Sequence, residues 1–446
     1  MTRNRCEVLA ASLDEAGCGV GAVEGIGEVH VADLLPGETA EVLIDHHSPH
    51  APRAWAHVAR RLGPTSPDRT APACPGFGRC GGCAWQHLAY PAQLAAKRAR
   101  VAAAIGDTPV PLAQIRPSPQ VTGYRNKGKY VAGRDAAGHV VLGAYVPRTH
   151  ELVDTLGCRT VAPVIDEIAT WIRGAVEGAG LAPYDEATRT GALRYAIVRE
   201  SGGDVLVALV VTSKTPRAAV ERVANALAHH PALRGIVAID NDRRDGAIIP
   251  SGATAQVLLG HGYLLEELAG ARVEVGAGEF LQVNRAQAAA MYARVAELAE
   301  AGPGTVAVDL FAGLGGIGLH LARAGATVTA VEIDREAVAQ LRRAAERAKL
   351  PVTALAGDAA SPPDQLPTAP DVVVVNPPRK GLSAGALALV ADLAPRTLVY
   401  VSCGPESLAR DLAALAERRY KPDAIEPFDL MPGTAQVETL VRLRSA

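Results

Sequence analysis

The rhythm of apolar and polar positions changes along this 446-residue chain. Over residues 1–60, short apolar runs such as 27–33 and 39–44 alternate with glycines, which predicts a small β-barrel. Several prolines then lead into a loop rich in glycine and cysteine, and an amphipathic helix is expected over 91–105. From 124 to 282, strand-like segments alternate with helix-like ones, which predicts an α+β unit.

From residue 284 onward, the pattern becomes a repeat of apolar strand, turn and helix. This repeat is typical of a doubly wound, Rossmann-like α/β sheet. We therefore predict an α/β protein with three domains, over 1–60, 61–283 and 284–446.

Composition excludes some classes of protein. Apolar residues make up 48% of the chain and charged residues 21%, as expected of a soluble globular protein. No apolar run approaches 18 residues, which argues against a membrane span. The amino terminus lacks the apolar core of a signal peptide, so we expect a cytoplasmic protein.

The net charge of −2 conceals a strong asymmetry. Residues 51–150 contain 14 lysines or arginines against three acids, a local surplus of +11. Within this stretch, the segment 124–130 interleaves tyrosines with arginine and lysine. Such a segment favours binding of nucleic-acid phosphates together with base stacking. The sequence therefore predicts RNA contact through a basic face.

Seven cysteines occur in the chain, an odd number that disfavours a disulfide framework. Cys74, Cys80 and Cys83 lie within ten residues of one another in a loop of small residues, and Cys158 is available to complete a set of four. Four thiolates suit either an iron–sulfur cluster or zinc. The spacing alone leaves both metals open.

A glycine-rich turn joins a predicted strand to a predicted helix over residues 306–319. Such turns let a nucleotide cofactor approach the backbone, although NAD would suit this turn equally well. Glu332 ends the next strand and is a candidate for binding ribose hydroxyls. Asp358 follows a third strand and is a candidate for contact with adenine. Asn376 and two prolines end a fourth strand in a rigid loop that suits a substrate base.

Cys403 follows the fifth predicted strand and has the position of a nucleophile. Glu438 begins the last predicted strand. If that strand is antiparallel to the others, its start lies at the edge where the others end. Cofactor, cysteine and glutamate are then expected to converge.

In this order, the motifs resemble the family of S-adenosylmethionine-dependent RNA 5-methyluridine methyltransferases over nearly the whole chain. The resemblance implies a TRAM barrel over 1–60, an RNA-binding central domain, S-adenosylmethionine as methyl donor and a [4Fe-4S] cluster. It implies Cys74, Cys80, Cys83 and Cys158 as cluster ligands, Gln282, Phe311, Gly316, Glu332, Asp358 and Asn376 as cofactor contacts, Cys403 as nucleophile and Glu438 as general base.

The chain departs from the family pattern at two positions near these sites. Asn376 stands where the family usually has aspartate, and Gln436 stands where it usually has histidine. The predicted barrel is also acidic for a module that holds RNA, so we assign more of the RNA contact to the basic stretch that follows it.

The family's chemistry explains the residue types. C5 of uracil is a poor nucleophile, so a thiolate must first add to C6. We expect cationic surroundings to lower the pKa of Cys403 and so favour the thiolate. The expected substrate is a flipped-out uridine in a loop of rRNA or tRNA, acted on by a monomer without a protein or membrane partner.

Two other readings remain open. The Asn376-Pro-Pro loop is similar to that of amino-group methyltransferases, although Arg379 stands where those enzymes stack a base on an aromatic residue. The chain is alternatively a non-catalytic RNA-binding protein on the same scaffold.

Overall fold

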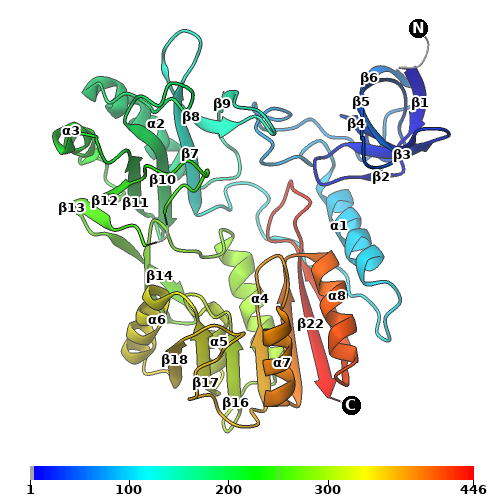
Figure 1. Cartoon of the computed structure of the whole chain (residues 1–446), viewed down its shortest axis with the longest axis vertical. Coiled ribbons are helices and arrows are strands. Elements are labelled where there is room, and N and C mark those ends of the chain that lie inside the picture. The colour runs from blue at the N-terminus through cyan, green and yellow to red at the C-terminus, as the bar shows by residue number, and fades with distance from the viewer. Residues whose placement is uncertain (1–4, 251, 446) are drawn as a thin grey trace.

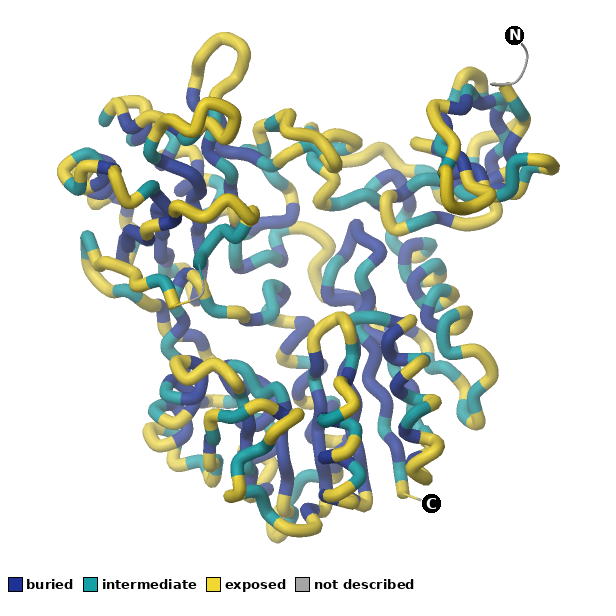
Figure 2. Tube along the Cα trace, in the orientation of Figure 1, coloured by how far each residue is buried: buried dark blue, intermediate teal, exposed yellow. Residues whose placement is uncertain are grey.

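Three large sheets and a two-stranded one organise the described part of the chain, residues 5–250 and 252–445 (Figure 1). In this computed structural model, buried residues follow the strands of the large sheets, while exposed residues follow the connecting loops (Figure 2). The first four residues of the predicted barrel and residue 446 lie outside the described ranges. The architecture confirms an α/β fold with a small barrel and an α+β unit before the last sheet.

The barrel is a six-stranded sheet in the order β1-β5-β6-β4-β3-β2. Its core contains apolar side chains such as Val29, Val31 and Val42. Along β5, buried residues alternate with partly buried ones over 39–44. The strands are β1 (Arg5–Leu9), β2 (Ser12–Leu13), β3 (Gly19–Val23), β4 (Gly27–Ala32), β5 (Thr39–His47) and β6 (Arg53–Leu62).

Many of the basic residues over 51–150 form ion pairs with acidic residues of the same chain. Arg61 and Arg69 both pair with Glu38, which is only 2% exposed. Although burial opposes ionisation, hydrogen bonds from Arg69 and from the backbone lower the pKa of Glu38 to about 2. Seven of the fourteen basic residues over 51–150 are in ion pairs: Arg53, Arg60, Arg61, Arg69, Arg79, Lys97 and Arg100.

The central unit is a seven-stranded sheet in the order β13-β12-β11-β10-β7-β8-β9. Helices α2 (Pro163–Ala179) and α3 (Arg217–Leu227) share its larger apolar core. Its strands are β7 (Lys127–Arg134), β8 (Val140–Tyr145), β9 (Leu152–Asp154), β10 (Leu193–Ser201), β11 (Asp204–Val211), β12 (Leu233–Asp240) and β13 (Ala255–Gly260). The hairpin β14 (Tyr263–Leu268) and β15 (Ala271–Gly276) follows and packs on α6 (Arg335–Ala348).

The last sheet has the order β18-β17-β16-β19-β20-β22-β21. Its first five strands pair in parallel, and β22 is antiparallel to β20, as the convergence argument required. The strands are β16 (Val306–Leu310), β17 (Thr327–Glu332), β18 (Val352–Ala356), β19 (Val372–Val375), β20 (Thr397–Ser402), β21 (Tyr420–Phe428) and β22 (Glu438–Ser445).

Helices cover both faces of this last sheet, with separate apolar cores on either side. Asn284 caps α4 by accepting a hydrogen bond from the Gln287 amide, and Asp334 caps α6 in the same way. The helices are α4 (Arg285–Leu298), α5 (Gly316–Arg323), α6 (Arg335–Ala348), α7 (Ala384–Leu393) and α8 (Pro405–Ala416).

Helix α1 (Tyr90–Ile105) comes from the segment after the barrel, yet it lies beside α8 of the last sheet (Figure 1). The amino-terminal segment therefore reaches the C-terminal unit directly. Among the described helices, none is long and apolar enough to cross a lipid bilayer.

Candidate active site

A cavity of about 680 Å³ opens at the carboxyl ends of the parallel strands of the last sheet. Its size is within the range of small-molecule sites, and its position at this sheet edge is where doubly wound folds bind their ligands. The structure brings together in this one cavity all eight residues predicted to bind cofactor or to catalyse: Gln282, Phe311, Gly316, Glu332, Asp358, Asn376, Cys403 and Glu438.

The turn after β16 gives the cavity its backbone-lined wall. Phe311 has a positive φ of 63°, an uncommon conformation for a bulky residue that re-aims the chain as the strand ends. Gly315 also has a positive φ, and a Cβ there would lie 2.2 Å from Leu341. A Cβ at Gly316 would lie 2.7 Å from the ring of Tyr292. Glycine is therefore required for the wall to pack against these side chains.

The Glu332 carboxylate is fixed by two backbone donors. Its Oε2 accepts a hydrogen bond of 2.8 Å from the Gly313 amide, and its Oε1 accepts one of 2.9 Å from the Asp334 amide. Each oxygen retains a lone pair for a vicinal diol. The next residue, Ile333, lines the same cavity and is 70% exposed, so it offers an apolar surface for a purine. These acceptor oxygens and this apolar surface fit an adenosyl group, and Ile333 is a lining residue that the sequence analysis missed.

The segment that carries Gln282 is held by the central unit. The Asn126 amide donates to the Val283 carbonyl at 2.9 Å, and Lys127 and Arg199 donate to the carbonyl of Glu279. The basic segment 124–130 therefore supports a wall of the cavity. The prediction that it stacks bases was wrong, because Tyr124 and Tyr130 are only 5% and 3% exposed. Phe280, 76% exposed, lies at the mouth of the cavity.

Cys403 and Glu438 lie opposite each other at the edge of the sheet. The antiparallel register of β20 and β22 pairs Ser402 with Thr439, so the next pair outward is Cys403 with Glu438. Both side chains line the cavity. A thiol and a carboxyl group therefore face one bound molecule from neighbouring strands.

The pKa of the Cys403 thiol is not lowered, contrary to the sequence prediction. Burial and then the nearby Glu438 raise the pKa of Cys403 to about 11, and the Arg379 guanidinium only partly opposes them. The prediction of a lowered pKa was wrong because desolvation and a like charge outweigh one cation.

The pKa of Glu438, in contrast, suits the predicted role of a general base. Burial raises its pKa to about 7, with Arg379 again opposing the shift. Its Oε2 atom is buried and has no hydrogen-bond partner. A carboxyl group with this pKa can accept a proton near neutral pH.

Arg379 and Gln436 form a contact that the sequence analysis did not anticipate. The Arg379 guanidinium donates to Oε1 of Gln436, and both side chains line the cavity. The sequence contained two signals of this contact: Gln436 stands where the family usually has histidine, and Arg379 follows the two prolines. Only the fold shows that they lie side by side, where Arg379 affects the pKa of both Cys403 and Glu438.

The four predicted cluster ligands are free, partly buried cysteines. Burial raises the pKa of Cys80, and the nearby thiols of Cys158 and Cys74 add to this rise. Burial likewise raises the pKa of Cys83, with Cys158 and Cys80 contributing. Within the described ranges, no three potential ligands are arranged to hold a metal ion. Four neighbouring thiols nevertheless suit a soft metal centre, so the cluster stays a prediction.

Comparison with known proteins identifies two families along the last sheet. Residues 290–396 match the methyltransferase small domain, and residues 368–446 match the tRNA (uracil-5-)-methyltransferase family. An uncharacterized RNA methyltransferase of Synechocystis sp. is 32% identical over 435 residues, covering 95% of this chain and 93% of the relative. Another, from Thermosynechococcus vestitus, is 34% identical and covers 99% and 98%.

A solved structure shares the whole fold. The tRNA (uracil-54, C5)-methyltransferase of Pyrococcus abyssi, in complex with S-adenosyl-L-homocysteine, superposes with a TM-score of 0.78 at 22% identity. The match covers 98% of this chain and 100% of that one. The relatives lead to one conclusion: the chain belongs to a family of RNA methyltransferases and is an S-adenosylmethionine-dependent enzyme of that family, with a C-terminal segment that matches the tRNA (uracil-5-)-methyltransferase family.

Proposed function

We propose that the protein transfers a methyl group from S-adenosylmethionine to C5 of a uridine in rRNA or tRNA, through a covalent bond between Cys403 and C6. The observation that carries this proposal is the position of Cys403 and Glu438 beside the Ser402–Thr439 pair of β20 and β22, inside the cavity lined by the cofactor-type residues. Neither an amino-group methyltransferase nor a passive RNA-binding protein requires this pair.

Each protein group has one task in the reaction. The resting thiol of Cys403 first loses its proton to solvent, and Arg379 is the cation beside the resulting thiolate. The sulfur adds to C6, which makes C5 a nucleophile for the methyl group. Glu438 then removes the proton from C5, the sulfur–C6 bond breaks and the thiolate is regenerated. Bound S-adenosylmethionine supplies the methyl group and leaves as S-adenosylhomocysteine.

The cofactor is assigned to the wall built by the strand ends. Glu332 holds the ribose hydroxyls and Asp358 contacts the adenine, while Phe311 and Gly316 line the methionine side. Gln282 and Asn376 complete the site. Asn376 is uncharged where the family usually has aspartate, so it holds ligands by hydrogen bonds alone.

The target uridine is proposed to be flipped out of its loop, because a stacked base cannot meet both sulfur and methyl group. The barrel takes the role of a TRAM domain in a monomeric enzyme. Cys74, Cys80, Cys83 and Cys158 are assigned to a [4Fe-4S] cluster, with zinc as the alternative metal. The metal centre would cross-link two distant segments, and no step of methyl transfer depends on it.

Trapping with fluorinated RNA tests the mechanism. Fluorine at C5 cannot be removed as a proton, so a transcript containing 5-fluorouridine should become covalently attached to the protein in the presence of S-adenosylmethionine. The adduct should survive denaturing electrophoresis and be absent in Cys403→Ser. Failure of the intact protein to form it would overturn the covalent mechanism.

The target RNA is a separate question. Mass spectrometry of nucleosides from rRNA and tRNA of cells with and without the protein should reveal missing 5-methyluridine in one of them. Loss of an N-methylated nucleoside instead would favour the amino-group reaction, and RNA binding without any methylation would favour the non-catalytic alternative.

A further inference from the structure

The loop between β21 and β22, residues 429–437, contributes to the lining of the cavity that contains Cys403 and Glu438. Leu430, Met431 and Gln436 line the cavity from this loop. The loop is closed at its base, because Phe428 pairs with Glu438 in the register of the two strands. Asp429 is therefore the direct chain neighbour of the residue that pairs with Glu438.

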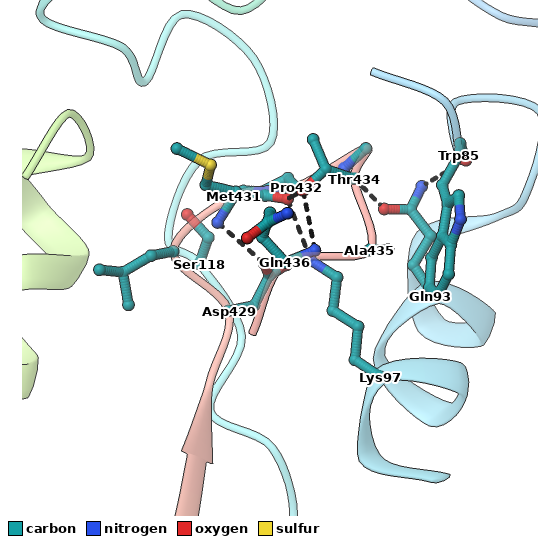
Figure 3. A network of polar contacts seen from close by, with 12 residues as sticks. Trp85, Gln93, Lys97, Ser118, Asp429, Met431, Pro432, Thr434, Ala435 and Gln436 are labelled. Atoms are coloured by element: carbon teal, nitrogen blue, oxygen red, sulfur yellow. Dashed lines mark hydrogen bonds and ion pairs between the residues drawn. The ribbon is translucent and has the colours of Figure 1, made fainter. Parts of the chain in front are cut away.

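The contacts that hold this loop come from far away in the chain (Figure 3). Nζ of Lys97, on α1, donates to Oδ1 of Asp429 at 2.5 Å and to the Met431 carbonyl at 3.0 Å. Both charged side chains are 0% exposed. The Gly433 amide donates to Gln93 of the same helix at 2.8 Å. Helix α1 therefore binds the loop at two places, Asp429 at its start and Gly433 near its middle.

The cysteine segment supports the loop from the same side. The Trp85 amide donates to the Gly433 carbonyl at 2.8 Å. Gly433 has a positive φ of 79°, and a Cβ there would lie 3.6 Å from Cβ of Cys83 and 3.3 Å from Gln86. The metal-binding candidate segment therefore packs directly on the loop that leads to Glu438.

A buried ion pair is a poor means of gaining stability, since apolar residues of similar volume often serve as well. Its advantage is directional, because an ammonium group with two oxygen partners fixes both of them in place. Here those partners are Asp429 and the carbonyl of Met431, two residues of the loop that faces the substrate.

We propose that Lys97 is a positioning residue for methyl transfer, which fixes loop 429–437 and thereby sets Glu438 against the target base. The inference rests on the proposed function, because it takes Glu438 as the base. Helix α1 and the cysteine segment then govern proton removal from C5, a step that follows formation of the covalent adduct.

The test separates positioning from stability. Lys97→Met alone would leave a buried charge, so the variant of choice is the double change Lys97→Met/Asp429→Asn, in which neither partner is charged. We expect its melting temperature to stay within a few degrees of the wild type. The kcat should fall ~10- to 100-fold, as expected for a small displacement of a catalytic group, while KM for S-adenosylmethionine stays unchanged.

A covalent intermediate provides the second readout. If proton removal from C5 is slowed, RNA without 5-fluorouridine should also accumulate as a covalent adduct of the protein on denaturing gels. The same adduct is expected with Glu438→Gln. The control Arg98→Met, on the same helix, removes only contacts to the carbonyls of Leu112 and Ala113 and should retain wild-type kcat. If the double variant does not fold, Gln93→Met removes an uncharged contact to the loop and should give the same pattern.

Two results would overturn the inference: wild-type kcat in the folded variant, or a lowered kcat without adduct accumulation. If Glu438→Gln itself accumulates no adduct, the assignment of the base is at fault and the proposed function fails with it. Adduct in Glu438→Gln but not in the Lys97 variants contradicts the positioning role alone.

Discussion

The cofactor half and the base half of the cavity are built in different ways. In the cofactor half, most residues follow neighbouring parallel strands and their contacts are local, as between Glu332 and the Gly313 amide. Gln282 is the exception, because the central unit holds its segment. In the base half, Glu438 depends on a loop held by Lys97, which lies 332 positions from its partner Asp429. The first half depends mainly on one sheet, whereas the second requires helix α1 to dock on the last sheet.

The largest effect should come from the residue where both halves meet. Cys403→Ala removes the nucleophile, so kcat should fall by on the order of 10⁴-fold or more. Calorimetry should show unchanged affinity for S-adenosylmethionine, since the cofactor half is intact. Cys6→Ala, on the barrel, is the matched control and should keep full activity. Residual activity within tenfold of the wild type would contradict the covalent mechanism.

Arg379 should rank second. Arg379→Met removes the cation that opposes the raised pKa values of Cys403 and Glu438, so the rate of a single turnover should fall ~100-fold. Gln436→Leu only removes the hydrogen-bond partner of the guanidinium, so the rate of a single turnover should fall ~10-fold. The exposed neighbour Lys380→Met serves as control. Equal effects of Gln436→Leu and Arg379→Met would show that orientation of the guanidinium matters more than its presence.

A change confined to the cofactor half should act on binding alone. Glu332→Gln replaces charge-assisted hydrogen bonds to the ribose, so affinity for S-adenosylmethionine should fall ~10- to 100-fold. RNA affinity in a filter-binding assay should not change. Glu336→Gln, on the exposed start of α6, should alter neither. A parallel loss of RNA binding would contradict the independence of the two halves.

The smallest expected effect is a change in the pH profile, which reports on the base half of the cavity. Burial raises the pKa of Glu438 to about 7, and the base must be ionised to remove the C5 proton. The rate at which the covalent adduct breaks down should therefore rise with pH and level off above about 7. Loss of Arg379, which stabilises the carboxylate, should move this midpoint upward. A profile that is flat through this range would exclude Glu438 as the titrating base.

The sequence predicted those features that depend on neighbours in the chain. Periodicity located the strands of the last sheet, and their ends marked Glu332, Asp358, Asn376, Cys403 and Glu438. The other three site residues, Gln282, Phe311 and Gly316, came from the family resemblance. β6 was missed because charged residues interrupt its alternation, although they pair with acids of β4 and β5. The raised pKa of Cys403 and the Arg379–Gln436 contact depend on burial and on segments that meet only in the fold. No local pattern records such effects.

The ion pairs around the barrel have a consequence for how the enzyme competes for its substrate in the cell. Binding of RNA releases condensed cations in proportion to the phosphates neutralised, and seven of the fourteen basic side chains over 51–150 are already engaged. On single-stranded RNA, this stretch would then contribute a salt exponent no steeper than about −5. Its affinity should tolerate changes in ionic strength far better than the formal charge of the stretch implies.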